Sequence, residues 1–134
     1  MPFDIINVCA GIIRKNDKIL ICQRSESKFN GAWEFPGGKV EINESQEQAL
    51  KRELEEELGI KAKIGHHFHT VYFKDSPTQQ INLHSYIINS YTGQITCHVH
   101  AQYKWVSIDN IALHNYLPAD LPIVAQITKL KKHP

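Results

Sequence analysis

The sequence predicts a mixed α/β (α+β) fold in a single domain spanning residues 1–134. Three observations support this. The length of 134 residues suits one hydrophobic core. Short apolar and β-branched runs, bounded by turn residues, recur along the chain and favour strands. One segment in the first half and one near the carboxyl end instead have the features of helices.

Strands are expected where apolar or β-branched residues lie between turn signals: residues 5–14, 18–23, 33–35, 61–74, 79–90 and 102–107. Asn16-Asp17 joins the first two strands as a hairpin. Residues 25–32 are polar and form a loop. Pro36-Gly37-Gly38 is expected to stop the third strand and form a glycine-rich loop. A late helix is expected over residues 121–131, with Pro122 in its first turn.

The clearest helix covers residues 45–58. Ser45 can cap its first turn, and Gln48, three residues later, completes a capping box. Gly59 stands where a helix commonly ends on a left-handed glycine. Leucines repeat at intervals of four residues and predict one buried stripe. The stripe consists of Leu50, Leu54 and Leu58.

Composition and charge narrow the function classes. The formal net charge is +1, so the chain lacks the basic excess typical of proteins that bind duplex nucleic acid. Cys9, Cys22 and Cys97 cannot all pair within the chain, and no two form a CxxC motif, which favours a reducing cytoplasm. Neither a signal peptide nor a membrane span is expected. An anionic ligand must then be held by a local site or by a metal ion.

The predicted helix carries carboxylates beside its leucine stripe. Glu53, Glu56 and Glu57 are spaced i, i+3, i+4 and share one face. One reading is a solvated acidic surface. However, Glu53 and Glu57 repel each other, and within the helix only Arg52 is placed to compensate a carboxylate, Glu56. A hard divalent cation would relieve the repulsion through oxygen ligands, so the spacing favours a metal site.

These residues match the pattern G-x5-E-x7-R-E-U-x-E-E-x-G-U, where U is a bulky aliphatic residue. The matching positions are Gly38, Glu44, Arg52, Glu53, Leu54, Glu56, Glu57, Gly59 and Ile60. The chain therefore resembles the Nudix hydrolase family. Residues 33–41 and 118–122, and Arg24 after the early hairpin, resemble its MutT subgroup, whose members include 8-oxo-dGTP diphosphatases and CTP pyrophosphohydrolases.

The resemblance implies the Nudix fold, an α/β/α sandwich with a mixed central sheet. It implies hydrolysis of a nucleoside triphosphate to the monophosphate and pyrophosphate, with Mg²⁺ (or Mn²⁺) as cofactor. The implied metal ligands are Glu53, Glu56, Glu57 and the Gly38 carbonyl, with Glu53 also the first choice for a general base. Supporting roles are implied for Glu44 near the metal, Arg52 orienting glutamates, and Lys39 and Arg24 at substrate phosphates.

One position departs from the family pattern. Related enzymes often carry a glutamate six residues before the tryptophan that is Trp105 here, where it is a metal ligand or base. This chain has Val99, between His98 and His100. Either the helix glutamates suffice or a neighbouring histidine takes part. In a strand, His98 and His100 would share one face.

The resemblance also implies a base pocket. Asp120 would read the base, because an ionised carboxylate accepts two hydrogen bonds, from a guanine edge or from a cytosine amino group. The alternative is that Asp120 only caps the late helix. Phe35 is the first candidate for stacking on a base, and Phe73 and Tyr86 are others, although each suits a core position equally well.

Several substrate classes remain open. The enzyme could sanitise oxidised nucleotides such as 8-oxo-dGTP or hydrolyse cytidine triphosphates. It could instead act on a dinucleotide or nucleotide sugar, or be a Nudix-fold binding module with reduced catalysis. The expected partner is a small nucleotide rather than nucleic acid or membrane. A monomer and a homodimer are both compatible with the sequence.

Overall fold

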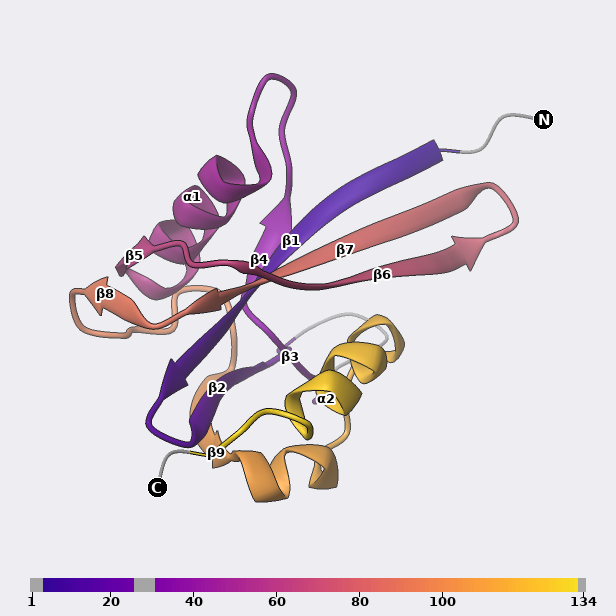
Figure 1. The fold of residues 1–134 in the computed structure, drawn as a ribbon. Helices are drawn as coiled ribbons and strands as arrows, with labels where there is room; N and C mark the ends of the chain where they lie inside the picture. Colours follow the sequence, from indigo (N-terminus) through magenta and orange to yellow (C-terminus); the bar gives the residue numbers. More distant parts are fainter. Residues whose placement is uncertain (1–3, 26–30, 133–134) are drawn as a thin grey trace.

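The computed structural model describes residues 4–25 and 31–132. A mixed sheet runs through the molecule, with the longer helix α1 on one face and the carboxyl-terminal helices on the other (Figure 1). This arrangement confirms the expected α/β/α sandwich. Residues 26–30 of the predicted loop lie outside the described residues.

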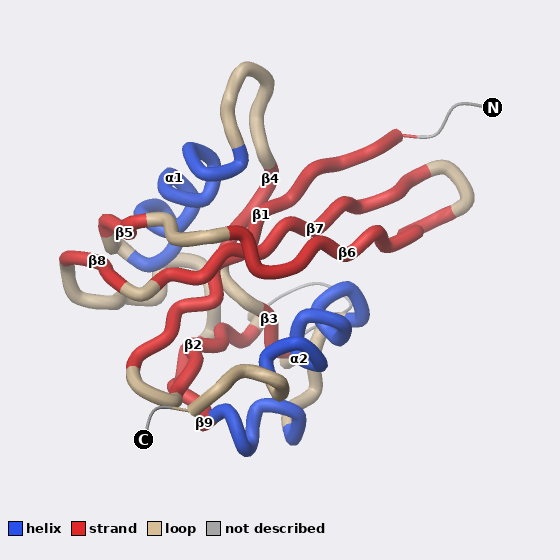
Figure 2. Tube along the Cα trace, viewed as in Figure 1, coloured by secondary structure: helices blue, strands red, loops and turns tan. Residues whose placement is uncertain are grey.

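The sheet is built around the longest strand, β1. Its neighbours run in the order β3-β2-β1-β7-β6, with β4 added to β1 and β9 added to β2 (Figure 2). β1 is parallel to β7, and the other pairs are antiparallel. The bounds are β1 Asp4–Lys15, β2 Lys18–Gln23, β3 Trp33–Glu34, β4 Gly37–Lys39, β6 His67–Ser76, β7 Gln79–Ile88 and β9 Gln102–Ser107.

Alternation along β1 divides the core into two layers. Ala10 and Ile12 face the carboxyl-terminal helices, while Cys9 and Ile13 face α1. Successive side chains of a strand point to opposite faces, so one apolar run can serve both layers. The central strand is therefore buried on both sides where the two layers meet.

Helix α1, Gln46–Leu58, forms as the sequence predicts. Ser45 accepts from the Gln48 backbone N–H, and the Gln48 side chain accepts from the Ser45 N–H, which closes the capping box. Gly59 ends the helix with φ 70°, a left-handed conformation in which glycine carries no steric penalty. The predicted leucine stripe is fully buried against the sheet. Local sequence signals thus fix both ends and the packed face of this helix.

Because the Ser45 hydroxyl satisfies an otherwise unpaired helix amide, Ser45→Ala is expected to lower the free energy of unfolding by about 1 kcal/mol. Urea denaturation followed by circular dichroism measures this loss. Glu55→Ala is the matched control, since Glu55 is exposed on the same helix. Its effect should stay within about 0.5 kcal/mol. Equal stability of Ser45→Ala and the wild type would contradict the capping role.

Several predicted boundaries are wrong. The segment 61–74 contains two strands, β5 Lys61–Lys63 and β6, because β5 leaves the main sheet to pair with β8, Ser90–Thr92. The late helix α2, Leu121–Ile127, ends before the predicted Lys131. It follows two 3-10 helices that the sequence did not predict, η1 Ile108–Leu113 and η2 Pro118–Asp120. Within the described ranges, no helix is long and apolar enough to cross a membrane.

The glycine-rich segment after Pro36 is a strand rather than the predicted loop. Gly37 and Gly38 pair with Ala10 and Cys9 of β1, and Lys39 pairs with Val8. Pro36 supplies its carbonyl to the Gly11 amide, so it joins the sheet without needing an N–H of its own. This pairing brings β4 beneath α1 and sets the position of the candidate site.

Candidate functional site

The candidate site forms where β4 passes against the carboxylate face of α1. The Gly37 N–H donates to Glu57 Oε1 over 3.0 Å. A Cβ atom on Gly38 would overlap the carboxylate of Glu53. The Gly38 carbonyl accepts from the Cys9 thiol at 3.3 Å. The missing side chain of Gly38 therefore allows the Glu53 carboxylate to lie directly against the backbone of β4, and the Gly37 amide holds Glu57.

Arg52 joins the loop carboxylate to the helix carboxylates. Its guanidinium donates to both oxygens of Glu44, at 2.8 and 2.9 Å, and to Glu53 Oε1 at 2.6 Å. It also donates to the Lys39 carbonyl at 3.1 Å and lies 3.5 Å from Glu56 Oε2. These charge-assisted bonds lower the pKa of Glu44 to about 2 and raise the pKa of Arg52. Glu44 and Arg52 together orient the Glu53 side chain.

The three helix glutamates have different surroundings. The Glu53 side chain is 17% exposed and that of Glu56 is 59% exposed. Glu57 is half-buried, and burial raises its pKa to about 7, while the charge of His100 and the Gly37 hydrogen bond act in the opposite direction. Glu53 and Glu57 therefore lie against β4, while Glu56 reaches toward solvent from the same helix.

The donor chemistry suits a hard divalent cation. Glu53, Glu57 and the Gly38 carbonyl are all oxygen donors, the ligand type that Mg²⁺ prefers. In the described ranges no ion pair reaches the half-buried Glu57 carboxylate. Those ranges also contain no ready-made group of three acidic, histidine or cysteine ligands. These oxygen donors are thus of the kind that binds such a cation. In the present structure Glu53 is paired with Arg52.

A second polar group centres on Glu34 of β3. Arg24 Nη1 lies 3.3 Å from Glu34 Oε1, and His100 Nε2 lies 2.8 Å from Glu34 Oε2. The charge of Glu34 raises the pKa of Glu57 and also that of Asp120. Glu34 thus lies within electrostatic reach of both the helix carboxylates and the predicted base-reading residue.

Asp120 is buried, which bears on the charge that the prediction gave it. The residue is 5% exposed, and burial raises the pKa of its carboxyl group well above the ordinary value, with Glu34 adding to the shift and Arg24 opposing it. Burial thus works against the ionised carboxylate that the prediction assumed, and the base-reading role stays a prediction. The capping alternative is wrong, because the Asp120 side chain makes no capping hydrogen bond to α2.

The histidines beside Val99 do not share a strand face as predicted. Residues 98–100 form bends, and the two rings have different partners. His98 is exposed, with Nδ1 2.9 Å from the Glu56 carbonyl oxygen. The His100 side chain is 6% exposed and bonds Glu34. Val99 itself is 59% exposed.

The structure also shows where Lys39 and the three aromatic candidates lie. Lys39 is exposed at the end of β4. Phe35 is only 4% exposed and stacks on Tyr116, with ring centroids 5.8 Å apart. Tyr86 is in the core layer beneath α1, and Phe73 packs against the layer on the other face. The structure therefore places the Phe35 ring in the core, and its stacking role stays a prediction.

Glu34 and His100 were missed as a pair by sequence reasoning. One local signal points to Glu34: it stands between Trp33 and Phe35, which are both buried in the core layer beside α2. A strand alternates faces, so a carboxylate between two core aromatics points away from their layer. No comparable signal identifies His100, because its partner lies 66 residues away.

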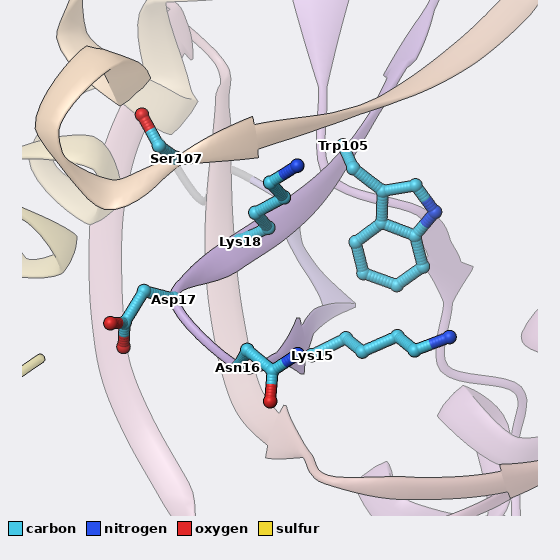
Figure 3. Close-up of a pocket in the computed structure, with 6 residues that line it drawn as sticks. All are labelled: Lys15, Asn16, Asp17, Lys18, Trp105 and Ser107. Carbon is cyan, nitrogen blue, oxygen red and sulfur yellow. The ribbon is translucent and has the colours of Figure 1, made fainter. Parts of the chain in front are cut away.

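A separate pocket of about 480 Å³ lies at the β1–β2 hairpin (Figure 3). Lys18 pairs with Ser107 at this end of β2, whereas Glu34 pairs with Cys22 near the other end. None of the predicted metal or substrate residues is among the described residues that line the pocket. These lining residues are Lys15, Asn16, Asp17, Lys18, Trp105 and Ser107.

Comparison of the sequence with known proteins indicates its family. The model of the NUDIX domain matches residues 5–127. The chain is 38% identical to a CTP pyrophosphohydrolase of Escherichia coli strain K12, over 95% of this chain and 94% of that protein. It is 37% identical to an 8-oxo-dGTP diphosphatase of Haemophilus influenzae, with the same coverage of both chains.

Solved structures agree. The E. coli ORF135 protein superimposes with a TM-score of 0.86 at 38% identity, covering 94% of this chain and 90% of that one. MutT from methicillin-resistant Staphylococcus aureus 252 gives 0.76 at 36% identity, covering 93% and 96%. The family model, the relatives and the solved structures together show that the chain belongs to the Nudix hydrolase family.

Proposed function

We propose that the protein is a Mg²⁺-dependent nucleoside triphosphate pyrophosphohydrolase of MutT type. It would convert a nucleoside triphosphate and water to the monophosphate and pyrophosphate. The observation that carries the proposal is the contact of the Glu53 and Glu57 carboxylates with β4 at Gly38 and Gly37. Relatives named 8-oxo-dGTP diphosphatase and CTP pyrophosphohydrolase, matched over nearly the whole chain, support it.

Nudix hydrolases generally need a divalent metal ion, and here Glu53, Glu56, Glu57 and the Gly38 carbonyl would hold it. Mg²⁺ suits these oxygen donors best, and Mn²⁺ is an alternative. When bound, the ion polarises phosphoryl oxygens and lowers the pKa of a coordinated water. The carboxylates also provide acceptors for the proton of the attacking water, and Glu53 is our first choice.

The other polar residues act on the substrate and on the carboxylates. Arg52 keeps Glu53 and Glu44 in fixed orientations through its hydrogen bonds to both. Lys39, exposed at the end of β4 next to Gly38, can neutralise phosphate oxygens. We assign Arg24 the same role at the other side of the site, where its ion pair with Glu34 leaves it 35% exposed. Phosphoryl transfer needs mainly positioning and charge neutralisation, which these groups supply.

The burial of Asp120 bears on the bases that it could read, because it works against the ionised form. A protonated carboxyl group offers one donor and one acceptor side by side, instead of two acceptors. It would pair with a base edge that presents an acceptor next to a donor, as guanine O6 with N1–H and cytosine N3 with its amino group do. An ionised carboxylate would instead suit the guanine N1–H and N2–H₂ edge. Both 8-oxo-dGTP and cytidine triphosphates therefore remain suitable substrates.

A substrate panel with Mg²⁺ tests the proposal. The panel contains 8-oxo-dGTP, dGTP, CTP, dCTP, ADP-ribose and a dinucleoside polyphosphate, and the products are separated by chromatography. Monophosphate and pyrophosphate from one of the triphosphates is the expected result. Turnover of only ADP-ribose or the dinucleotide would move the protein to another Nudix substrate class. Nucleotide binding with no turnover of any compound would instead indicate a binding module.

A further inference from the structure

His100 is a buried polar residue, bonded to Glu34 in the second polar group, that the family pattern does not assign. Its side chain is 6% exposed, and Nε2 lies 2.8 Å from Glu34 Oε2. The second ring nitrogen, Nδ1, is also buried and has no hydrogen-bond partner among the described residues. A buried nitrogen without a partner costs free energy, and an apolar side chain would avoid that cost. The residue therefore needs an explanation other than packing.

The backbone around position 100 directs this ring inward. The Ala101 N–H donates to the Gln23 carbonyl at 3.0 Å, and the Ser25 hydroxyl donates to the Val99 carbonyl at 3.3 Å. The bend is thus attached to the end of β2, next to β3. Val99 then projects to solvent, and His100 reaches Glu34. The histidine, and not the residue where related enzymes carry a glutamate, enters the site.

The negative charges of Glu34 and Glu57 repel each other, so the position of the Glu34 carboxylate matters. Its charge acts unfavourably on ionised Glu57, whereas the charge of His100 acts favourably on it. Arg24 lies at Glu34 Oε1 and His100 donates to Oε2, so the two donors fix both oxygens. Without His100, Oε2 would lose its donor and the Glu34 side chain could rotate.

We propose that His100 is a positioning residue, which donates from Nε2 to Glu34 and holds that carboxylate in a fixed place. Catalysis then depends on position 100 rather than on position 99. The proposal rests on the proposed function, because it concerns how the same site is kept in order. His100 acts through Glu34 and is not itself assigned contact with the substrate.

Two substitutions separate hydrogen bonding from packing. His100→Gln keeps an N–H donor at about the place of Nε2, while His100→Leu fills similar space without a donor. We expect His100→Leu to lower kcat/KM by about 10- to 100-fold, the scale of losing a residue that orients a functional group. His100→Gln should stay within a few-fold of the wild type. Val99→Ala, at the exposed neighbouring position, is the matched control and should leave kcat/KM unchanged.

A double-mutant cycle tests the route through Glu34. If His100 acts by holding that carboxylate, His100→Leu should cost little further activity in a Glu34→Gln background. The proposal is overturned if the cost is the same in both backgrounds, or if the Leu and Gln variants lose activity equally. It is also overturned if both keep full kcat/KM and only their melting temperatures fall, since His100 would then serve stability alone.

A spectroscopic readout keeps this test independent of the proposed function. In ¹⁵N-labelled protein, the Nε2 of His100 should carry a proton, and Glu34→Gln should shift the Nε2 resonance. If no nucleotide is hydrolysed but this signature is present, the proposed function fails while the His100–Glu34 contact stands. If the signature is absent in an active enzyme, the positioning proposal fails alone.

Discussion

Glu53→Gln is expected to lower kcat by at least about 100-fold, the scale of removing one preorganised charged contact from an active site. The substitution keeps the size of the side chain and removes its charge. Glu53 lies against Gly38 and pairs with Arg52 at 2.6 Å, so a neutral amide there weakens both the proposed metal site and the Arg52 contact. Pyrophosphate release at saturating triphosphate and Mg²⁺ measures the effect.

Glu55→Gln is the matched control for this substitution. Glu55 lies on the same helix, is exposed and should tolerate the change with an unaltered kcat. A thermal melt adds a second readout, because a ligand that binds only the folded state raises the melting temperature. Mg²⁺ should raise the melting temperature of the wild type more than that of Glu53→Gln. Full activity of Glu53→Gln would remove Glu53 from the active site.

Helix α1 was the part of the fold most open to prediction. Its capping box, its leucine stripe and its terminal glycine are signals within a few residues of one another. Each reports a local interaction, and all three agree on the same helix. The order of the carboxylates within that helix follows from the same geometry, which is why Glu53, Glu56 and Glu57 could be placed on one helix face from the sequence.

Strand β4 could not be predicted in the same way. A segment of Gly-Gly-Lys has low intrinsic preference for a strand, and glycines after proline are typical of loops. The pairing with Val8, Cys9 and Ala10 depends on residues nearly 30 positions earlier. The close approach of Gly38 to the Glu53 side chain, and of Gly37 to the backbone of β1, is visible only once α1 and the sheet are packed together.

The burial of single polar side chains, and its effect on their charge, could not be predicted from the sequence either. The prediction treated Asp120 as an ionised carboxylate that accepts two hydrogen bonds, whereas its burial works against that form. His98 and His100 were treated alike because they flank Val99, although only His100 is buried and bonded to Glu34. Burial is a property of the packed chain, so residue type and spacing could not distinguish these cases.

Gly38→Ala is expected to separate site geometry from folding. The new methyl group would overlap the carboxylate of Glu53, which is the far end of a flexible side chain and can move aside. The fold and melting temperature should therefore change little. A displacement of about 1 Å in a positioned group can cost on the order of 100-fold in rate. We expect a loss of that size in kcat, measured by pyrophosphate release.

Substitution of the neighbouring glycine, Gly37, is expected to affect stability instead. A Cβ atom on Gly37 would overlap the Cys9 carbonyl oxygen and approach the Cα atom of Ala10, both backbone atoms of the paired strand β1. Backbone in the middle of a sheet cannot yield as a side chain can, so Gly37→Ala should fail mainly by loss of stability. Wild-type kcat in Gly38→Ala would mean that the resting contact between Glu53 and β4 is not used in the reaction. An equal loss of stability in Gly38→Ala and Gly37→Ala would mean that both glycines are required for strand pairing rather than for the geometry of the site.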